Sequence, residues 1–429
     1  MNDAAAAPRR RLPAATDLRG AAQLAVDATA GLVDLVEAVH AGIARAPGLP
    51  APADGRTRGI TGLVYRTVRG VTRLAGGGVD ALLGLLATDL AKPDPPQADG
   101  ALPARTGPPS PAREALVAAL NGVLGDHLEA SGNPLAIPLQ LRAQGRALLL
   151  QPEALRQRLP QAGGSIAVLV HGLCMNDLSW APGAAPGQGG DGAAAAPGGL
   201  APKLAAAGYT PLALHYNSGR SIARNGADFA RELEALVAAW PVAVQRLVLV
   251  GHSMGGLVAR SAQHQAQQQG LRWPSLLSDL ACLGTPHQGA PLEQLGHAVT
   301  AVLGATPYAK PFARLARLRS AGITDLRHGR LLADSAAFVP LPAGVRCLAL
   351  AGTLGEADGA VRRRVLGDGL VPLPSALGQH ADPGRALLFL PEHTWVGAGI
   401  GHLALVSQPA VHAQLLAWLA APAPAGRAG

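Results

Sequence analysis

The sequence is poor in lysine and in aromatic residues. Its basic residues are almost all arginine, because the only lysines are Lys92, Lys203 and Lys310. The formal net charge of +8 would suit a nucleic-acid partner, but aromatic residues make up only 3% of the chain. That is too few for the base-stacking surfaces of single-strand binders, and the arginines are spread over the whole sequence. We therefore expect no nucleic-acid partner.

The sequence also lacks a disulfide framework and a long apolar run. Cys174, Cys282 and Cys347 are odd in number and unpaired in spacing, which is typical of small buried residues in a reducing compartment. No uncharged apolar stretch is long enough to span a bilayer, and no apolar stretch follows the arginine-rich start. These features favour a cytoplasmic protein. Neither C-x-x-C nor H-E-x-x-H spacing occurs, so we expect no metal site and no cofactor.

The first 110 residues predict an N-terminal helical region that ends in a linker. Apolar residues at helical spacing predict helices over 16–45 and 59–90, and the Pro-rich stretch 91–113 predicts a linker. The second helix carries several arginines and no acid between Gly55 and Val79. It therefore suits peripheral contact with a membrane or a lipid granule, or packing on the rest of the chain with its arginines solvated. Both alternatives stay open.

Residues 111–429 predict a second domain with a different pattern. A helix over 111–130 and a hairpin turning at Gln144-Gly145 come first. Short apolar runs then alternate with helical segments, which predicts a mostly parallel sheet flanked by helices on both faces. The long connection over about 286–343 predicts a helical cap, and the Gly/Ala/Pro-rich stretch 181–199 predicts a loop. The apolar runs are 166–170, 211–215, 246–251, 280–284, 345–351 and 386–390, and the helical segments are about 222–240, 254–268 and 409–420.

One junction between a predicted strand and a helix carries a reactive pattern. Gly251-His252-Ser253-Met254-Gly255 follows an apolar run and precedes helical sequence, as in a nucleophile elbow. A serine in such a sharp turn holds its hydroxyl clear of the sheet, and the flanking glycines avoid collisions with neighbouring backbone. A serine hydroxyl is a poor nucleophile unless a base takes its proton and an acid orients that base.

Five segments of the sequence belong together in this interpretation: VLVHGLCMNDLSW, VGHSMGG, CLGTPHQGAPL, GDGLVP and GIGHLALV. Together they resemble the α/β-hydrolase superfamily, in particular bacterial lipases, esterases and related lipid deacylases. The resemblance covers about residues 160–420 and implies an α/β-hydrolase fold. It also implies Ser253 as the nucleophile, Asp368 as the acid and His402 as the base. The amide N–H groups of Leu173 and Met254 would then form the oxyanion hole.

Two of these assignments have alternatives in the sequence. Asp368 lies well beyond the preceding apolar run, so Glu356 and Asp358 remain alternatives for the acid. His393 directly follows the run 386–390 and is the main alternative for the base. His412 lies within the last helical segment, where a packed or surface imidazole is the simpler interpretation.

The resemblance further implies residues that border the substrate. His171 and Gly172 belong to the oxyanion loop, where His171 is expected to brace the loop. His252, beside the nucleophile, is expected to pack or to line the pocket wall. Thr285 lies in the GTPHQG segment, which resembles a loop that borders the acyl pocket in the family.

Together these features predict a serine hydrolase that cleaves carboxylic esters, as an esterase or lipase, through an acyl-enzyme. The expected partner is a small-molecule or lipid ester. An acyl-thioesterase or polyester depolymerase is the alternative within the same chemistry. A non-catalytic lipid- or granule-associated protein on the same scaffold is the alternative of another class.

Overall fold

The fold is described from a computed structural model. It describes residues 17, 19, 20 and 22–24 and the ranges 111–181, 199–291, 320–334, 338–355 and 367–421. Residues 109–129 and 136–429 form one compact unit, and residues 1–108 with 130–135 form another. The predicted helix over 59–90, nearly all of the helix over 16–45, most of the linker and the alternative acids Glu356 and Asp358 lie outside the described residues. The predicted domain boundary near residue 110 and the membrane contact stay predictions.

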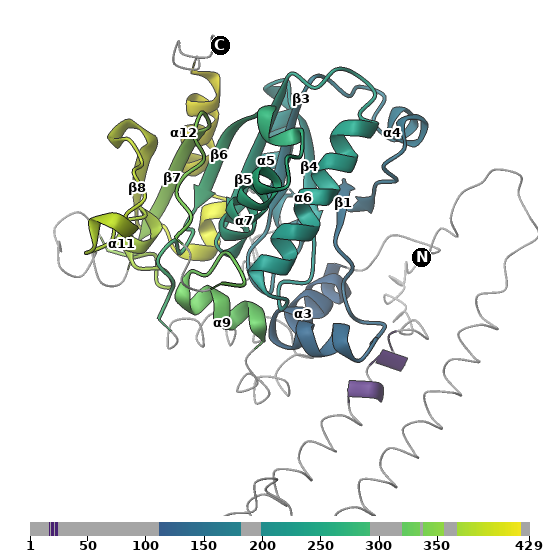
Figure 1. The fold of residues 1–429 in the computed structure, drawn as a ribbon, viewed down its shortest axis with the longest axis horizontal. Helices are drawn as coiled ribbons and strands as arrows, with labels where there is room; N and C mark the ends of the chain where they lie inside the picture. Colours follow the sequence, from purple (N-terminus) through teal and green to yellow (C-terminus); the bar gives the residue numbers. More distant parts are fainter. Residues whose placement is uncertain are drawn as a thin grey trace, which may run out of the picture. The chain divides into compact units, whose positions relative to one another are not determined.

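The larger unit is built on an eight-stranded sheet in the order β2-β1-β4-β3-β5-β6-β7-β8 (Figure 1). β1 pairs antiparallel with β2 and β4, and every other neighbouring pair is parallel. The strands are β1 (Gln140–Ala143), β2 (Arg146–Ala147), β3 (Ser165–Val170), β4 (Thr210–His215), β5 (Arg246–His252), β6 (Leu277–Leu283), β7 (Arg346–Thr353) and β8 (Thr394–Ala398).

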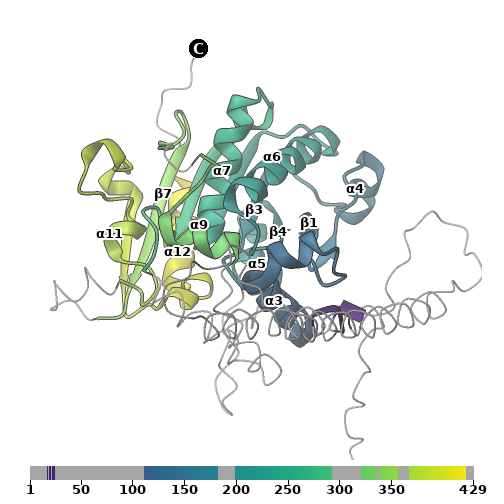
Figure 2. The same cartoon turned by 60° about the horizontal axis from the view of Figure 1, so that its bottom comes forward.

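Helices cover both faces of the sheet, as the alternating sequence predicts. They are α3 (Pro111–Ala130), α4 (Pro152–Arg158), α5 (Leu200–Ala206), α6 (Ile222–Ala239), α7 (Met254–Gln268), α9 (Ala321–His328), α11 (Leu373–Ala376) and α12 (Pro409–Ala420). Figure 2 shows the same elements turned, with α6 and α7 again side by side. Five short 3₁₀ helices complete the described part: η1 (Asp177–Trp180), η2 (Trp273–Ser275), η4 (Pro383–Arg385), η5 (Pro391–His393) and η6 (His402–Val406). None of the described helices is both long and apolar enough to cross a membrane.

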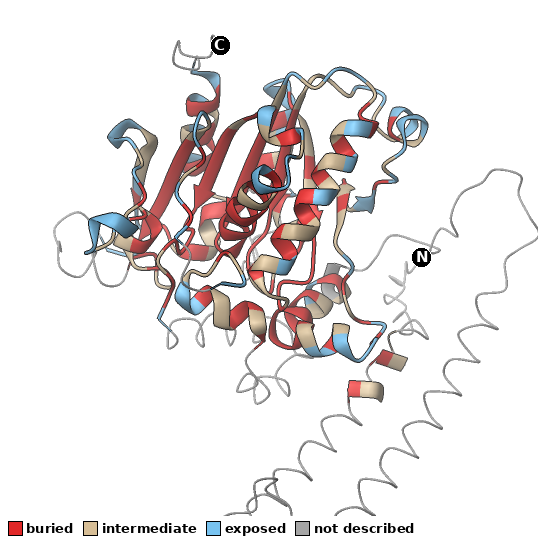
Figure 3. Ribbon diagram, viewed as in Figure 1, coloured by how far each residue is buried: buried red, intermediate tan, exposed pale blue. Residues whose placement is uncertain are grey.

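The strands are buried on both faces, which explains their continuous apolar runs. Successive side chains of a strand point to opposite faces, so Val168 of β3 packs with Phe229 of α6 and Leu257 of α7. The next residue, Leu169, packs on the other face in a cluster that includes Leu204 of α5 and Leu415 of α12. In Figure 3 the central strands are accordingly almost entirely buried. Two apolar layers therefore sandwich the sheet.

Most of the predicted elements are present, and one predicted strand is wrong. The hairpin turn falls at Gln144 and Gly145, whose φ angles of 51° and 73° suit a tight two-residue turn. Residues 386–390 are not a strand: Leu387 is buried while Leu388 is 84% exposed, and the Leu387 N–H donates to the Gly378 carbonyl at 2.8 Å instead of pairing with the sheet. The last strand is β8, over Thr394–Ala398. Of the predicted cap, α9 is a helix, and residues 292–319 lie outside the described part.

A buried carboxylate ties the strands β5, β6 and β7 together at their amino ends. Asp279 on β6 is completely buried and accepts hydrogen bonds from Arg246 of β5 at 2.8 Å and Arg346 of β7 at 2.7 Å. The same guanidinium groups also donate to the carbonyls of Leu419 and Ala421 at the end of α12, at 3.0 and 2.9 Å. One charge therefore fixes three strands and the last helix.

Removing this charge should destabilise the fold. Asp279→Asn leaves two guanidinium groups without their counter-ion, so we expect the free energy of unfolding to fall by about 3 kcal/mol. Chemical denaturation measures this change. Glu153→Gln, which breaks the exposed Arg156–Glu153 pair, is the control and should cost at most about 1 kcal/mol. Equal effects of the two substitutions would contradict the role of Asp279.

Candidate active site

The serine of the predicted elbow occupies a strained turn between β5 and α7. Ser253 has φ 53° and ψ −124°, a backbone conformation that residues other than glycine rarely adopt. Its N–H donates to the carbonyl of Leu283 at 2.8 Å. A Cβ on Gly251 would lie 2.4 Å from the Gly256 nitrogen, and a Cβ on Gly255 would lie 2.1 Å from the Val170 oxygen. Both flanking glycines are therefore required by close backbone contacts.

The predicted acid and base form a buried hydrogen-bonded pair. Asp368 Oδ2 lies 2.7 Å from His402 Nδ1, and the side chains of both residues are at most 5% exposed. Asp368 Oδ1 accepts from the N–H groups of Leu370 and Val371 at 3.0 and 2.8 Å. The His402 N–H also donates to the Asp368 carbonyl at 3.0 Å. Two loops that are far apart in the sequence are thereby joined.

The environment keeps Asp368 ionised and sets the tautomer of His402. Burial by itself would raise the pKa of Asp368, but attraction to the His402 imidazole and the hydrogen bonds it accepts outweigh burial, so the pKa is lowered. An ionised carboxylate accepts a hydrogen bond, so Nδ1 of His402 must carry the proton. Nε2 is then left with a free lone pair, which is the form a general base needs.

The nucleophile turn and the acid–base pair meet at the carboxyl edge of the sheet. His252 Nε2 donates to the His402 carbonyl at 3.0 Å, and the two imidazole rings lie 4.8 Å apart. Gly284 lies against the acid–base pair: a Cβ there would lie 3.1 Å from Asp368 Oδ2 and 3.2 Å from His402 Nδ1. Within the described part of the chain, no hydrogen bond joins the Ser253 hydroxyl to His402. In free enzymes such bonds are often long, and they tighten when substrate binds.

The loop after β3 lies against the serine. A Cβ on Gly172 would come within 3.1 Å of both Ser253 Cβ and His252 Nδ1. Among the hydrogen bonds of the described residues, none engages the N–H of Leu173 or that of Met254. Met254 is the first residue of α7, so its amide also lies at the positive end of a helix dipole.

His171 and Thr285 are fully buried beside the site. The His171 ring stacks on Tyr216 at 4.4 Å, and its Nδ1 lies 2.9 Å from the Gly172 carbonyl oxygen. The Tyr216 hydroxyl in turn donates to the His171 carbonyl at 2.8 Å. Thr285 packs on the nucleophile helix, because a Cβ on Gly256 would lie 2.0 Å from its Oγ1. Both residues brace the backbone around the serine.

The alternative bases take part in other contacts. His393 lies in η5, before β8, with its ring edge-on to Trp418 at 5.8 Å. His412 on α12 is buried, with Nε2 2.9 Å from the Val406 oxygen and Nδ1 3.1 Å from Lys203 Nζ. His402 is the imidazole that is hydrogen-bonded to Asp368. No group of three or more metal-ligating side chains occurs among the described residues.

Two features of the site are not evident from sequence patterns. Gly284 has φ 57° and makes room for the acid–base pair, and only its place at the end of the apolar run 280–284 marks it as a strand end. Leu354 is 56% exposed, although a Cβ on Gly369 would lie 2.9 Å from its Cδ1. Leu354 therefore lies beside the Asp368 turn with an apolar side chain partly open to solvent.

The strand order, the serine turn after β5 and the Asp368–His402 pair after β7 and β8 are arranged as in an α/β-hydrolase fold. A family model described as a PGAP1-like alpha/beta domain matches residues 229–339. No curated protein is significantly similar in sequence.

Solved structures that match part of this chain include three enzymes. The mature lipase BlEst2 of Bacillus licheniformis is 20% identical, with 59% of this chain and 91% of that chain covered and a TM-score of 0.38. An esterase of Thermogutta terrifontis is 14% identical, with 66% of this chain and 93% of that chain covered and a TM-score of 0.36. Phospholipase PlaB of Legionella pneumophila is 16% identical, with 61% of this chain and 60% of that chain covered and a TM-score of 0.40. Likenesses of this degree say nothing about substrate.

Two buried imidazoles should make the protein sensitive to acid. Burial lowers the pKa of His171 and of His252 to about 3. The unfolded chain takes up protons at these groups near pH 6.5, whereas the folded chain does not until about pH 3. The free energy of unfolding should therefore fall by about 1 kcal/mol per pH unit for each imidazole below pH 6.

Denaturation curves between pH 7 and pH 4.5 test this expectation. His252→Gln removes one titrating group and should show a shallower loss of stability with acid than the wild type. His127→Gln, at an exposed position of α3, is the matched control and should follow the wild-type curve. If His252→Gln is as acid-sensitive as the wild type, His252 does not contribute.

Proposed function

We propose that the protein is a serine hydrolase that cleaves carboxylic esters. The observation that supports this most is the buried Asp368–His402 pair at 2.7 Å beside the strained turn of Ser253. A carboxylate that holds one imidazole nitrogen protonated leaves the other free to act as a base. A serine in such a turn is the group that this base would serve.

In the proposed reaction Ser253 Oγ attacks the carbonyl carbon of the ester, and His402 Nε2 takes the hydroxyl proton. Asp368 stabilises the imidazolium that forms. The negative charge on the carbonyl oxygen is bound by the N–H groups of Leu173 and Met254. His402 then gives the proton to the leaving alcohol, and an acyl-enzyme on Ser253 remains. A water molecule, deprotonated by His402, releases the acid by the same steps in reverse order.

The identity of the nucleophile can be tested by removing it. Ser253→Ala should lower the turnover of a p-nitrophenyl ester by roughly 10⁴–10⁶-fold, and adding His402→Ala should cost little more because the triad acts as a unit. Labelling by a fluorophosphonate probe should disappear in parallel. Ser275→Ala, which removes an exposed hydroxyl on η2, is the control and should keep both activities.

Two outcomes would contradict the proposal. A Ser253→Ala variant with a near-normal rate would assign the chemistry to another residue. A folded wild-type protein that takes up no fluorophosphonate and hydrolyses neither esters nor thioesters would favour a non-catalytic, lipid-associated role. A series of esters and thioesters of increasing acyl length would separate an esterase from a thioesterase.

A further inference from the structure

Helix α3 precedes the alternating strands and helices, yet its middle is surrounded by protein. Residues 118–125 of α3 are all buried. A helix that is buried on every side is part of a core and not a peripheral connector. The elements that surround it include the loops that follow β3 and β4 at the carboxyl edge of the sheet, where the proposed active site lies.

One of these contacts is made between α3 and the loop that carries Leu173. Gly122 faces Cys174: a Cβ on Gly122 would lie 2.2 Å from Cys174 Sγ and 2.9 Å from Cys174 N. The thiol of Cys174 also donates to the carbonyl of Ala119, at 3.8 Å. Cys174 follows Leu173 directly, so α3 packs against the residue next to a proposed oxyanion donor.

The backbone of Cys174 is held in a conformation that it would not keep alone. Its φ is 60°, in the left-handed region that residues other than glycine rarely occupy. Its N–H donates to Ser218 Oγ at 3.1 Å. Leu173 thus lies between Gly172, which touches Ser253, and Cys174, which α3 and Ser218 hold. The direction of the Leu173 N–H depends on both neighbours.

The loop after β4, which supplies Ser218, is itself packed on α3. Asn217 Nδ2 donates to the Gly125 carbonyl at 2.8 Å, and a Cβ on Gly125 would lie 1.8 Å from Asn217 Oδ1. A Cβ on Gly219 would lie 2.1 Å from the backbone carbonyl oxygen of Asn121. Small residues on both sides therefore allow the helix and the loop to approach at backbone distance.

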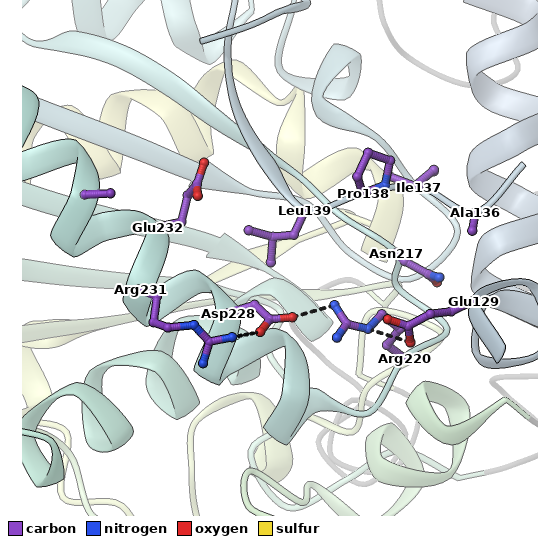
Figure 4. Close-up of a pocket in the computed structure, with 11 residues that line it drawn as sticks. Glu129, Ala136, Ile137, Pro138, Leu139, Asn217, Arg220, Asp228, Arg231 and Glu232 are labelled. Carbon is purple, nitrogen blue, oxygen red and sulfur yellow. Dashed lines mark hydrogen bonds and ion pairs between the residues drawn. The ribbon is translucent and has the colours of Figure 1, made fainter. Parts of the chain in front are cut away.

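The far end of α3 is fixed by ion pairs. Arg220 forms ion pairs with Glu129 of α3 at 3.0 Å and with Asp228 of α6 at 2.7 Å, and all three residues line a cavity of about 620 Å³ (Figure 4). On the side of α9, Ser320 Oγ donates to the Gly122 carbonyl at 2.8 Å, and the Ala321 N–H donates to Asp126 at 2.9 Å. These contacts hold the helix in register with the loops.

We propose that α3 is a positioning element of the oxyanion hole, and that Gly122 and Cys174 are the positioning residues through which it acts on the Leu173 amide. The inference rests on the proposed function for the chemistry, but the contacts it uses are separate from Ser253, Asp368 and His402. Donors of an oxyanion hole must be held in place before the charge develops. α3 supplies that hold from outside the strand–helix alternation.

The critical variant is Gly122→Ala, because the added methyl group displaces Cys174. We expect kcat for a p-nitrophenyl ester to fall about 10-fold or more, short of the roughly 10²–10³-fold cost of losing a donor outright. KM should stay within about twofold, because the interaction is made in the transition state. Gly163→Ala is the matched control, since a Cβ there meets nothing within 4 Å, and it should keep the wild-type kcat.

A second substitution distinguishes positioning from general damage. Cys174→Ala removes the sulfur, which is the atom that the Gly122→Ala methyl group would approach most closely, so the double variant should recover part of the lost kcat. An unchanged kcat in a folded Gly122→Ala variant would overturn the proposal. A loss of kcat that Cys174→Ala does not relieve would also overturn it.

One further measurement separates this proposal from the proposed function. If the wild type hydrolyses no ester and takes up no fluorophosphonate, the proposed function fails on its own. The positioning claim is then decided by hydrogen–deuterium exchange of residues 171–176. Exchange there should be faster in Gly122→Ala than in Gly163→Ala, and equal exchange would overturn it.

Discussion

The arrangement of the candidate site depends on one buried carboxylate. Asp368 is only 3% exposed, and an ionised group at such a depth must be satisfied by donors. Its carboxylate accepts hydrogen bonds from the His402 ring on one oxygen and from the amides of Leu370 and Val371 on the other. Its backbone carbonyl accepts a hydrogen bond from the backbone N–H of His402. Satisfying this single charge closes the turn around Asp368 and fixes the loop after β8. The imidazole is therefore oriented in the free protein, before any substrate is present.

The strained serine turn is held by the same edge of the sheet. A residue with φ 53° and ψ −124° keeps that conformation only where its surroundings determine it. The bond from the Ser253 N–H to Leu283, and the bond from His252 to the His402 carbonyl, connect the turn to β6 and to the base loop. The parallel register of β5, β6 and β7 brings these strand ends together, so the sheet supplies the geometry that the chain order alone lacks.

Much of this fold could be predicted because central parallel strands are buried on both faces. β3 and β5 appear in the sequence as unbroken apolar runs, and Gly251-x-Ser253-x-Gly255 marks the junction between β5 and α7. β8 could not be predicted in this way, because it is an edge strand of five residues with one fully buried position, Gly397. The nearby run 386–390 is more apolar, but its alternate side chains face solvent. The glycines on both sides of Asp368 allow a turn to be predicted there. Its closeness to His402 could not be predicted, because it depends on how the two loops are placed by the fold.

The packing of α3 illustrates what a sequence pattern cannot contain. Apart from Asn121, its sequence around Gly122 is apolar, and apolar contacts alone have no direction that would fix the register of a helix on its neighbours. Directional bonds remove that freedom. Asn121 Oδ1 accepts from the Ile137 N–H at 2.9 Å, Asn217 Nδ2 donates to the Gly125 carbonyl, and Ser320 Oγ donates to the carbonyl of Gly122.

Each of these three polar side chains is at most 2% exposed, so the loss of any one bond leaves a buried polar group unsatisfied. The observed register of the helix satisfies all of them at once. In that register Gly122 meets Cys174, which places the helix directly against the loop that carries the Leu173 amide. Polar residues that look unremarkable in the sequence therefore connect the segment before the sheet to the backbone around the serine.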